Sequence, residues 1–355
     1  MPVKVNYRFA ILCALVPYLV LAMPLAADAL LLEKPIVCEQ GVDCFIQNYV
    51  DAEPGPGYAD DYCGSLSYDK HKGVDFRVPF TMMQEGVEVE AAAPGIVRGV
   101  RDGMEDVSIR QGGVESIKNR ECGNGVVISH ADGVETQYCH MRKGSIRVKA
   151  GEKVATGQPL GLVGLSGDTE FPHLHFEVRV HGKTVSPFTG KDMESGCSAQ
   201  EGKTLWSEKA LKSMPYTPTG ALDAGFSIEQ PDINTVFVGG KKKVVFSPQS
   251  PQVLFWAGFW GVQKGDSITM RIDTPNGEVW TAPEQILPRN QAQILVTMGK
   301  KRTGPWPPGT YKGKVALVRP GANGKKSIVL PMARSMVIPP TGDTSSSEQT
   351  TNPTP

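Results

Sequence analysis

The sequence predicts a mainly β protein, with a domain of antiparallel sheet over residues 66–190 followed by a small β-sandwich over residues 226–338. Short runs of β-branched and aromatic residues recur between turns that contain glycine. Two of these runs meet across residues 131–133 (Ala-Asp-Gly), which is a hairpin signal. Residues 173–180 alternate with period two, as a strand with two distinct faces should.

Length and charge limit the classes of protein that the chain can represent. Its 355 residues favour two folded units, and a hydrophobic content of 40% is sufficient for ordinary buried cores. Lys and Arg together number 37, as do Asp and Glu, so the formal net charge is zero. This balance gives no support to nucleic-acid binding or to electrostatic attachment to a membrane.

The first 29 residues have the features of a secretory signal peptide. Lys4 and Arg8 provide a positive start, residues 9–22 form an apolar run, and residues 27–29 (Ala-Asp-Ala) match a cleavage pattern. A membrane anchor is the alternative, but Pro17 interrupts the run and Pro24 follows it, and the run is short for a span of about 20 residues. We therefore expect a secreted or periplasmic protein with no stable membrane anchor after signal removal.

Cysteine usage agrees with export. Cys13 would leave with the signal, and six cysteines remain, all before residue 200: Cys38, Cys44, Cys63, Cys122, Cys139 and Cys197. An even number in an exported chain predicts up to three disulfides bracing the first domain. A cysteine metal site is the alternative, but there is no C-x-x-C pair. Six cysteines allow 15 connectivities, among which the sequence does not choose.

Composition divides the rest of the chain. Residues 30–65 contain a Gly- and Pro-rich stretch and predict an irregular lead-in to the first domain. Residues 191–225 resemble a linker between the two β-rich units, and residues 339–355 form a Ser/Thr/Pro-rich tail that we expect to be disordered.

Histidine is confined to the first unit, where its spacing indicates a metal site. His71 and Asp75 lie four residues apart around a glycine, in a pattern that favours a turn entering a strand. His173 and His175 lie two apart on a strand and project from one face. A catalytic zinc takes three protein ligands and a water. An H-x-x-x-D pair plus one histidine of an H-x-H strand meets that need, and two histidines remain for proton transfer.

The other histidines have simpler interpretations. Tyr138 and His140 should share one face of their strand, with Cys139 on the opposite face. His130 and His181 lie at turn-like positions, and we interpret them as surface or structural side chains.

At these motifs the chain resembles the lysostaphin-type (M23) zinc metallopeptidases. The matching pieces are residues 71–76 (His-Lys-Gly-Val-Asp-Phe), 87–97, 123–130, 136–141 and 172–179 (Pro-His-Leu-His-Phe-Glu-Val-Arg), in family order. The resemblance covers residues 66–190 and leaves the second unit uncovered.

The resemblance implies a site and an activity. His71, Asp75 and His175 would bind Zn²⁺, and His140 and His173 would be the catalytic pair, one accepting a proton and the other stabilising the oxyanion. The substrate would be a peptidoglycan stem or cross-bridge peptide, or a protein. Glu170 and Phe171 depart from the small residues usual before the last motif and would reshape the substrate groove.

Two alternatives stay open. Some members of the family have lost their ligands and act as non-catalytic scaffolds or activators of other hydrolases, but all five positions are filled here. The second unit would serve an envelope protein partner or the wall if its aromatic residues were exposed; burial in a core is the stronger expectation. These residues are Phe255, Trp256, Phe259, Trp260, Trp280 and Trp306.

Overall fold

The computed structural model describes residues 1–3, 30–111, 117–197, 202–237, 244–321 and 327–340. Most of the predicted signal peptide and of the predicted disordered tail lie outside these residues. The described chain is mainly β, and its named strands pair antiparallel, which confirms the predicted fold class. Within the described ranges, no helix is long and apolar enough to cross a membrane.

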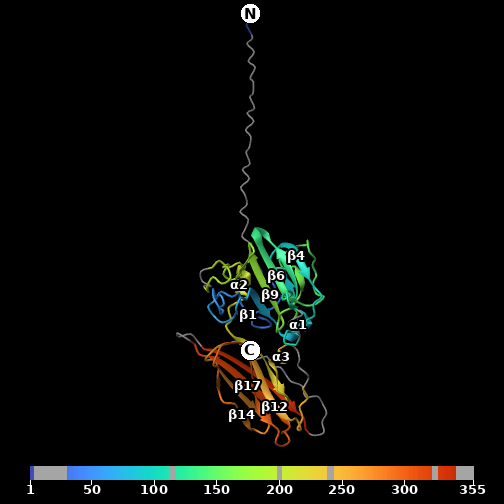
Figure 1. Cartoon of the computed structure of the whole chain (residues 1–355), viewed down its shortest axis with the longest axis vertical. Helices are drawn as coiled ribbons and strands as arrows, with labels where there is room; N and C mark the ends of the chain where they lie inside the picture. The colour runs from blue at the N-terminus through green and yellow to red at the C-terminus, as the bar shows by residue number, and fades with distance from the viewer. Residues whose placement is uncertain (4–29, 112–116, 198–201, 238–243, 322–326, 341–355) are drawn as a thin grey trace.

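The largest sheet organises the first part of the chain, coloured blue to yellow-green in Figure 1. Its strand order is β1 (Phe45–Asn48), β2 (Gly73–Arg77), β9 (His173–Val180), β6 (Val134–Met141), β5 (Asn124–Ser129), β4 (Gly95–Arg101) and β7 (Lys153–Val154), with β10 (Lys183–Val185) beside β9. β5 and β6 form the predicted hairpin, joined by the 3-10 turn η2 (Ala131–Gly133). A two-stranded sheet, β3 (Glu88–Glu90) with β8 (Pro159–Leu162), lies in the same part of the chain.

Alternation along β9 gives the large sheet two different faces. Leu174, Phe176 and Val178 are fully buried in the apolar core, whereas His173 and His175 point the other way. The pairing of β2 with β9 sets Asp75 opposite His175, so that the polar positions of both strands share one face.

The expected lead-in and linker take part in this fold more than their composition indicates. β1 lies in the lead-in and pairs with β2, so the segment is not wholly irregular. Helix α2 (Glu208–Lys212) lies in the expected linker, where Ser207 accepts a hydrogen bond from the amide of Ala210 at its start. Both segments contribute apolar side chains to the first core, including Leu32, Ile36, Ile46, Trp206 and Met214. Local composition is a weak guide where long-range burial decides structure.

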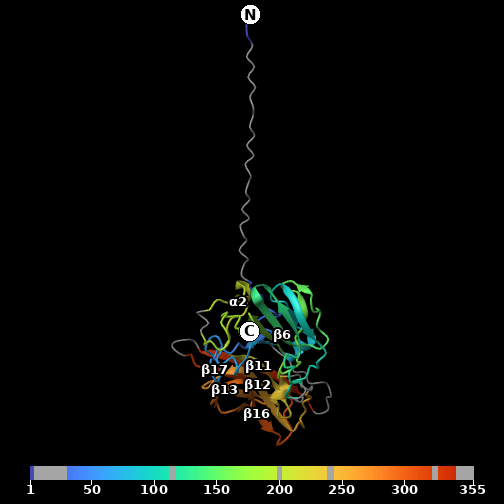
Figure 2. The ribbon, with the colours of Figure 1, turned by 45° about the horizontal axis from the view of Figure 1, so that its top comes forward.

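Two further sheets form the second part, coloured yellow-orange to red in Figures 1 and 2. One has the order β11 (Gly220–Ser227), β12 (Gln252–Val262) and β16 (Gln291–Lys301). The other has the order β14 (Val279–Thr281), β13 (Ser267–Asp273), β17 (Gly309–Arg319) and β18 (Ile328–Ile338), with β15 (Gln285–Ile286) beside β13. Both sheets contribute to one apolar core. The sandwich expected here stays a prediction, and this shared core supports it.

All six aromatic residues singled out in the second unit are buried, with exposed fractions of at most 7%. Trp260 also reaches the first part of the chain, where its ring stacks on Phe45 at a centroid distance of 4.6 Å. Near this boundary lie helices α1 (Phe80–Glu85) and α3 (Ile233–Val236), labelled in Figure 1. The two parts of the chain are therefore in direct contact.

The six cysteines pair as three disulfides, Cys38–Cys44, Cys63–Cys197 and Cys122–Cys139. The number agrees with the prediction, and pairing removes the cysteines as metal ligands. Cys63–Cys197 links residues 134 apart in sequence and joins the lead-in to the segment that follows the sheet.

Candidate metal centre

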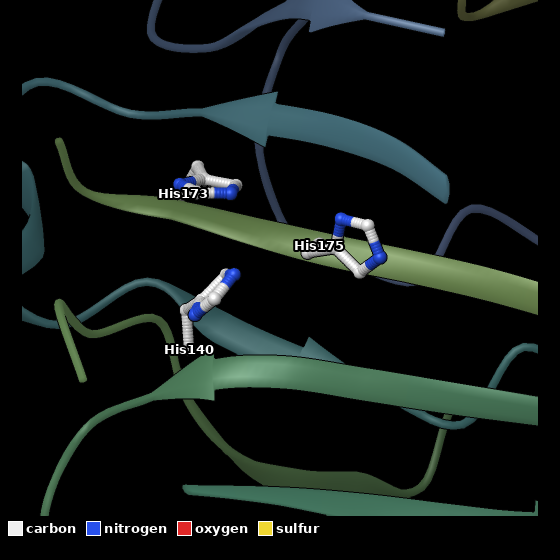
Figure 3. Close-up of side chains that lie close together, drawn as sticks. All are labelled: His140, His173 and His175. Carbon is white, nitrogen blue, oxygen red and sulfur yellow. The ribbon is translucent and has the colours of Figure 1, made fainter. Parts of the chain in front are cut away.

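Five predicted site residues converge on the polar face of the large sheet, at the junction of β2, β9 and β6. His71 precedes β2, Asp75 lies within it, and His173 and His175 lie on β9. His140 stands at the end of β6 and faces the two histidines of β9 (Figure 3). Its ring centroid lies 4.6 Å from that of His173 and 5.8 Å from that of His175.

Three of these residues direct donor atoms toward one point. Asp75 Oδ1 lies 3.1 Å from His71 Nε2 and 2.8 Å from His175 Nδ1, and the two histidine nitrogens are 3.2 Å apart. Ligands of a tetrahedral zinc at its usual bond lengths are about 3.3 Å apart. The three donor atoms therefore fit the ligand shell of one small divalent cation.

Neighbouring groups fix the orientation of these donors. His71 Nδ1 donates to the carbonyl of Tyr49 at 2.7 Å, which leaves the lone pair of Nε2 facing the centre. Asn48 Nδ2 donates to Asp75 Oδ2 at 2.8 Å, so the other carboxylate oxygen stays free to face the centre. Such outer partners are typical of metal-binding histidines and carboxylates.

Gly73 makes room for the third donor. A Cβ atom at this position would meet His175 Cε1 and Nε2 at 2.7 Å, closer than real side chains approach. The glycine in the H-x-x-x-D motif is thus required by the close approach of the β9 imidazole.

His140 and His173 are held beside the centre by main-chain carbonyls. His140 Nδ1 donates to the carbonyl of Ser166 at 2.8 Å, and His173 Nδ1 donates to that of Phe171 at 2.9 Å. Thr169 Oγ1 lies 3.1 Å from the same nitrogen of His173. Both rings therefore present Nε2 to the site, and His173 Nε2 lies 3.4 Å from Asp75 Oδ1.

His140 does not share a face with Tyr138, contrary to our expectation. Tyr138 is buried in the core, where its hydroxyl accepts a hydrogen bond from the amide of Ala92. Cys139, not Tyr138, lies opposite His175. The backbone of His140 has φ = 60°, in the left-handed region, and this interrupts the two-residue alternation. Such conformations in residues other than glycine often occur at functional sites.

Burial and neighbouring charge set the protonation of the site. Burial lowers the pKa of His140 well below its ordinary value, and the nearby His173 and His175 lower it further. For Asp75, burial would raise the pKa, but the surrounding histidines outweigh it and hold the pKa well below the usual range. The site therefore contains an ionised carboxylate beside a neutral imidazole.

The remaining histidines lie outside this cluster. His130 bonds to the carbonyl of Pro94 and to Thr136 Oγ1, at 2.8 and 2.7 Å. His181 has φ = 48° in the turn before β10, with its ring against Gly133. Both positions fit the structural interpretation that the sequence favoured.

Sequence reasoning missed the residues that orient the cluster. Asn48 and the carbonyl of Tyr49 come from β1 and its end, within the expected irregular lead-in. Thr169 precedes the last motif, but no recognisable sequence pattern singles it out. The one signal in the sequence was the amide pair Gln47-Asn48 inside an otherwise apolar run.

An antiparallel sheet that gathers two imidazoles and a carboxylate, with two more imidazoles beside them, defines a candidate metal-dependent hydrolase. Residues 69–187 match the model of the family described as Peptidase family M23. All five residues of the cluster lie within this segment, and the domain that contains them belongs to that family.

Curated relatives match the same part of the chain. The DD-carboxypeptidase/endopeptidase Mpg of Neisseria meningitidis is 35% identical over 117 residues, which are 33% of this chain and 22% of that protein. The peptidoglycan DD-endopeptidase ShyA of Vibrio cholerae is 34% identical over 116 residues, again 33% and 22%. The chain thus spans about a fifth of the length of these relatives.

Among solved structures, a catalytic-domain variant of the prophage-encoded M23 protein EnpA from Enterococcus faecalis is 29% identical in sequence. The match covers 42% of this chain and 92% of that one, with a TM-score of 0.29.

Proposed function

We propose that the protein is an exported zinc metalloendopeptidase that hydrolyses peptide bonds in peptidoglycan stems or cross-bridges. The observation that carries the proposal is the triangle of His71 Nε2, Asp75 Oδ1 and His175 Nδ1, with sides of 2.8–3.2 Å, beside the two imidazoles of His140 and His173. The names of the relatives Mpg and ShyA support peptide bonds of the wall as the substrate class.

His71, Asp75 and His175 would hold the metal. Zinc, when bound, supplies a water that ionises near neutral pH and a Lewis acid for the scissile carbonyl. Two neutral imidazoles and one carboxylate form a ligand set that suits this ion. With a cation between them, the three donor atoms would need no shared proton to lie this close together.

His140 and His173 divide the proton transfer and the charge stabilisation. His140 is favoured as the proton acceptor, because it is held neutral and its Nε2 lone pair faces the site. His173 would then donate a hydrogen bond to the developing oxyanion when it is protonated at Nε2. Ser166 and Phe171 keep both rings oriented through their main-chain carbonyls.

The alternative function is a non-catalytic scaffold or activator of other hydrolases. The complete set of five side chains favours the enzyme, because a scaffold has no need of a neutral base held against a buried carboxylate. Export is part of the proposal and is supported by the N-terminal sequence and by the three disulfides.

Digestion of peptidoglycan and of casein, in parallel, tests the proposal. The purified protein should release peptide fragments from peptidoglycan, lose this activity with a zinc chelator and regain it when zinc is restored. Casein cleavage without peptidoglycan cleavage would replace the substrate class. Zinc-loaded protein that cleaves neither substrate would support the scaffold instead.

A further inference from the structure

A buried arginine continues the polar face of the sheet beyond the metal centre. Arg77 is only 3% exposed and lies on β2, two residues after Asp75. It pairs across the sheet with His173, so the two side chains share a face. The row of residues next to the catalytic histidine therefore contains a full positive charge.

The contacts of this guanidinium are with neutral groups. Its Nη1 donates to the side-chain oxygens of Gln47 and Gln293, at 2.6 and 2.9 Å. The ring of Phe171 lies 4.2 Å from its central carbon. An arginine guanidinium keeps its proton at neutral pH, so this buried group is cationic.

No carboxylate of the described residues forms an ion pair with Arg77. The acid that acts on it at longer range is Glu170, whose carboxylate is bound by Arg110 at 2.6 Å. Buried arginines are rarely left without an anionic partner, because an uncompensated charge in a protein interior is costly. This exception points to an anionic group that a bound ligand would supply.

Arg77 also lines a cavity of about 220 Å³ between the two parts of the chain. Phe45 and α1 contribute one wall, and Leu222, Asp223 and Phe237 contribute the other. Asp223 is paired with Arg334 at 3.1 Å, so its charge is compensated. Cavities for drug-sized ligands span roughly 300–1,000 Å³, so this one suits an end group or a short side chain.

Phe171 lies between Arg77 and His173 of the metal centre. Its ring lies against both Arg77 and His173, at centroid distances of 4.2 and 5.0 Å, and its carbonyl orients the histidine. A peptide bound across the site could thus place one group against Arg77 while its scissile bond faces His140 and His173.

We propose that Arg77 binds a carboxylate of the peptide substrate, with the second part of the chain forming the end wall of that subsite. This rests on the proposed peptidase function and adds a specificity determinant to it. The carboxylate is either the C-terminal one of a stem peptide or one on a side chain. A charge-assisted hydrogen bond of this kind should favour such substrates by about tenfold to a hundredfold.

The test compares three synthetic stem pentapeptides ending in D-Ala-D-Ala: the free acid, its C-terminal amide, and a form in which only the side-chain carboxylate is amidated. The wild type should cleave one of the two amidated forms at least tenfold less well than the free acid, in kcat/KM. Whichever form is affected identifies the source of the carboxylate. Equal rates on all three would overturn the inference.

Variants of Arg77 separate charge recognition from support of the domain contact. Arg77→Met should cleave all three peptides at the same rate, whereas Arg77→Lys should retain part of the preference. If Arg77→Lys and Arg77→Met behave alike, Arg77 serves only to hold the two parts together. Arg98→Gln, a change at an arginine whose side chain is 69% exposed on β4, is the matched control and should keep the full preference.

A binding experiment keeps this inference separate from the peptidase proposal. Titration of the free acid and the C-terminal and side-chain amides into zinc-loaded His140→Ala protein, which should not cleave them, measures affinity alone. Tighter binding of the free acid, lost in the Arg77→Met double variant, supports the subsite even if no peptide is turned over. Equal affinities for all three would reject the subsite and leave the peptidase proposal standing.

Discussion

The two β-rich parts of the chain bury different kinds of side chain. The first contains a metal-type cluster and other buried polar groups, among them His71, Asp75 and Arg77. The second buries mostly apolar and aromatic side chains, and buried Asp266 forms an ion pair with the partly buried Arg319. Buried polar groups cost stability unless they are satisfied. Their concentration on one sheet face therefore indicates where function is located, and the aromatic residues of the second part are explained by packing.

The largest expected effect is the loss of the metal, and with it of activity, from the first part of the chain. His71→Ala, Asp75→Ala or His175→Ala should each remove zinc, because two donors cannot hold the ion in competition with water. Turnover should fall by more than the roughly 10⁴-fold that proton transfer can contribute. Elemental analysis of the purified variants checks the metal. A His71 or Asp75 variant that kept zinc would favour the other donor set in the cluster, His140, His173 and His175.

The next effect separates catalysis from metal binding. His140→Ala should retain zinc and lose about 10²–10⁴-fold in kcat, since it removes the favoured proton acceptor. His130→Ala, which alters a histidine hydrogen-bonded to Pro94 and Thr136, is the control and should stay active. Near-normal cleavage by the His140 variant would show that the roles are assigned wrongly.

A change in the second part tests the other side of the comparison. Phe255 is fully buried, and its ring centroid lies 5.1 Å from that of Phe226. Phe255→Ala should lower the free energy of unfolding by about 3–5 kcal/mol. Zinc affinity, measured by competition with a chromophoric chelator, should not change. A parallel loss of zinc would mean that the two parts fold as one unit.

The smallest expected effect concerns a residue that binds no metal itself. Asn48→Ala removes the hydrogen bond to Asp75 Oδ2 and should weaken zinc binding by about 10–100-fold. Asn48→Asp is a useful comparison, because it puts a second carboxylate beside the first in a buried site. It should disturb the pKa of Asp75 as well as the metal affinity.

The candidate site was more predictable from sequence than its surroundings. Strand periodicity and a short turn predict the directions within each pair, His71 with Asp75 and His173 with His175. The ligand set that joins the two pairs followed from the resemblance to the M23 family. The face of His140 could not be predicted in this way, since the rule assumes extended backbone and this residue has φ = 60°.

The parts of the fold that long-range contacts create were also missed. β1 becomes a strand because β2 offers it an edge, and α2 is ordered because its apolar side chains reach the first core. Neither cause is visible in a local window of sequence. The same reason hid Asn48, which approaches Asp75 only through the pairing of those two strands.

The bond between Cys122 and Cys139 has a practical consequence for producing the protein. Cys139 directly precedes His140, and the amide of His140 donates to the carbonyl of Cys122. Protein made in a reducing cytoplasm would lack this link, which supports one of the main-chain contacts that hold His140 in place. Recombinant material should therefore come from an oxidising host compartment, and a reductant in the assay buffer should be treated as an inhibitor.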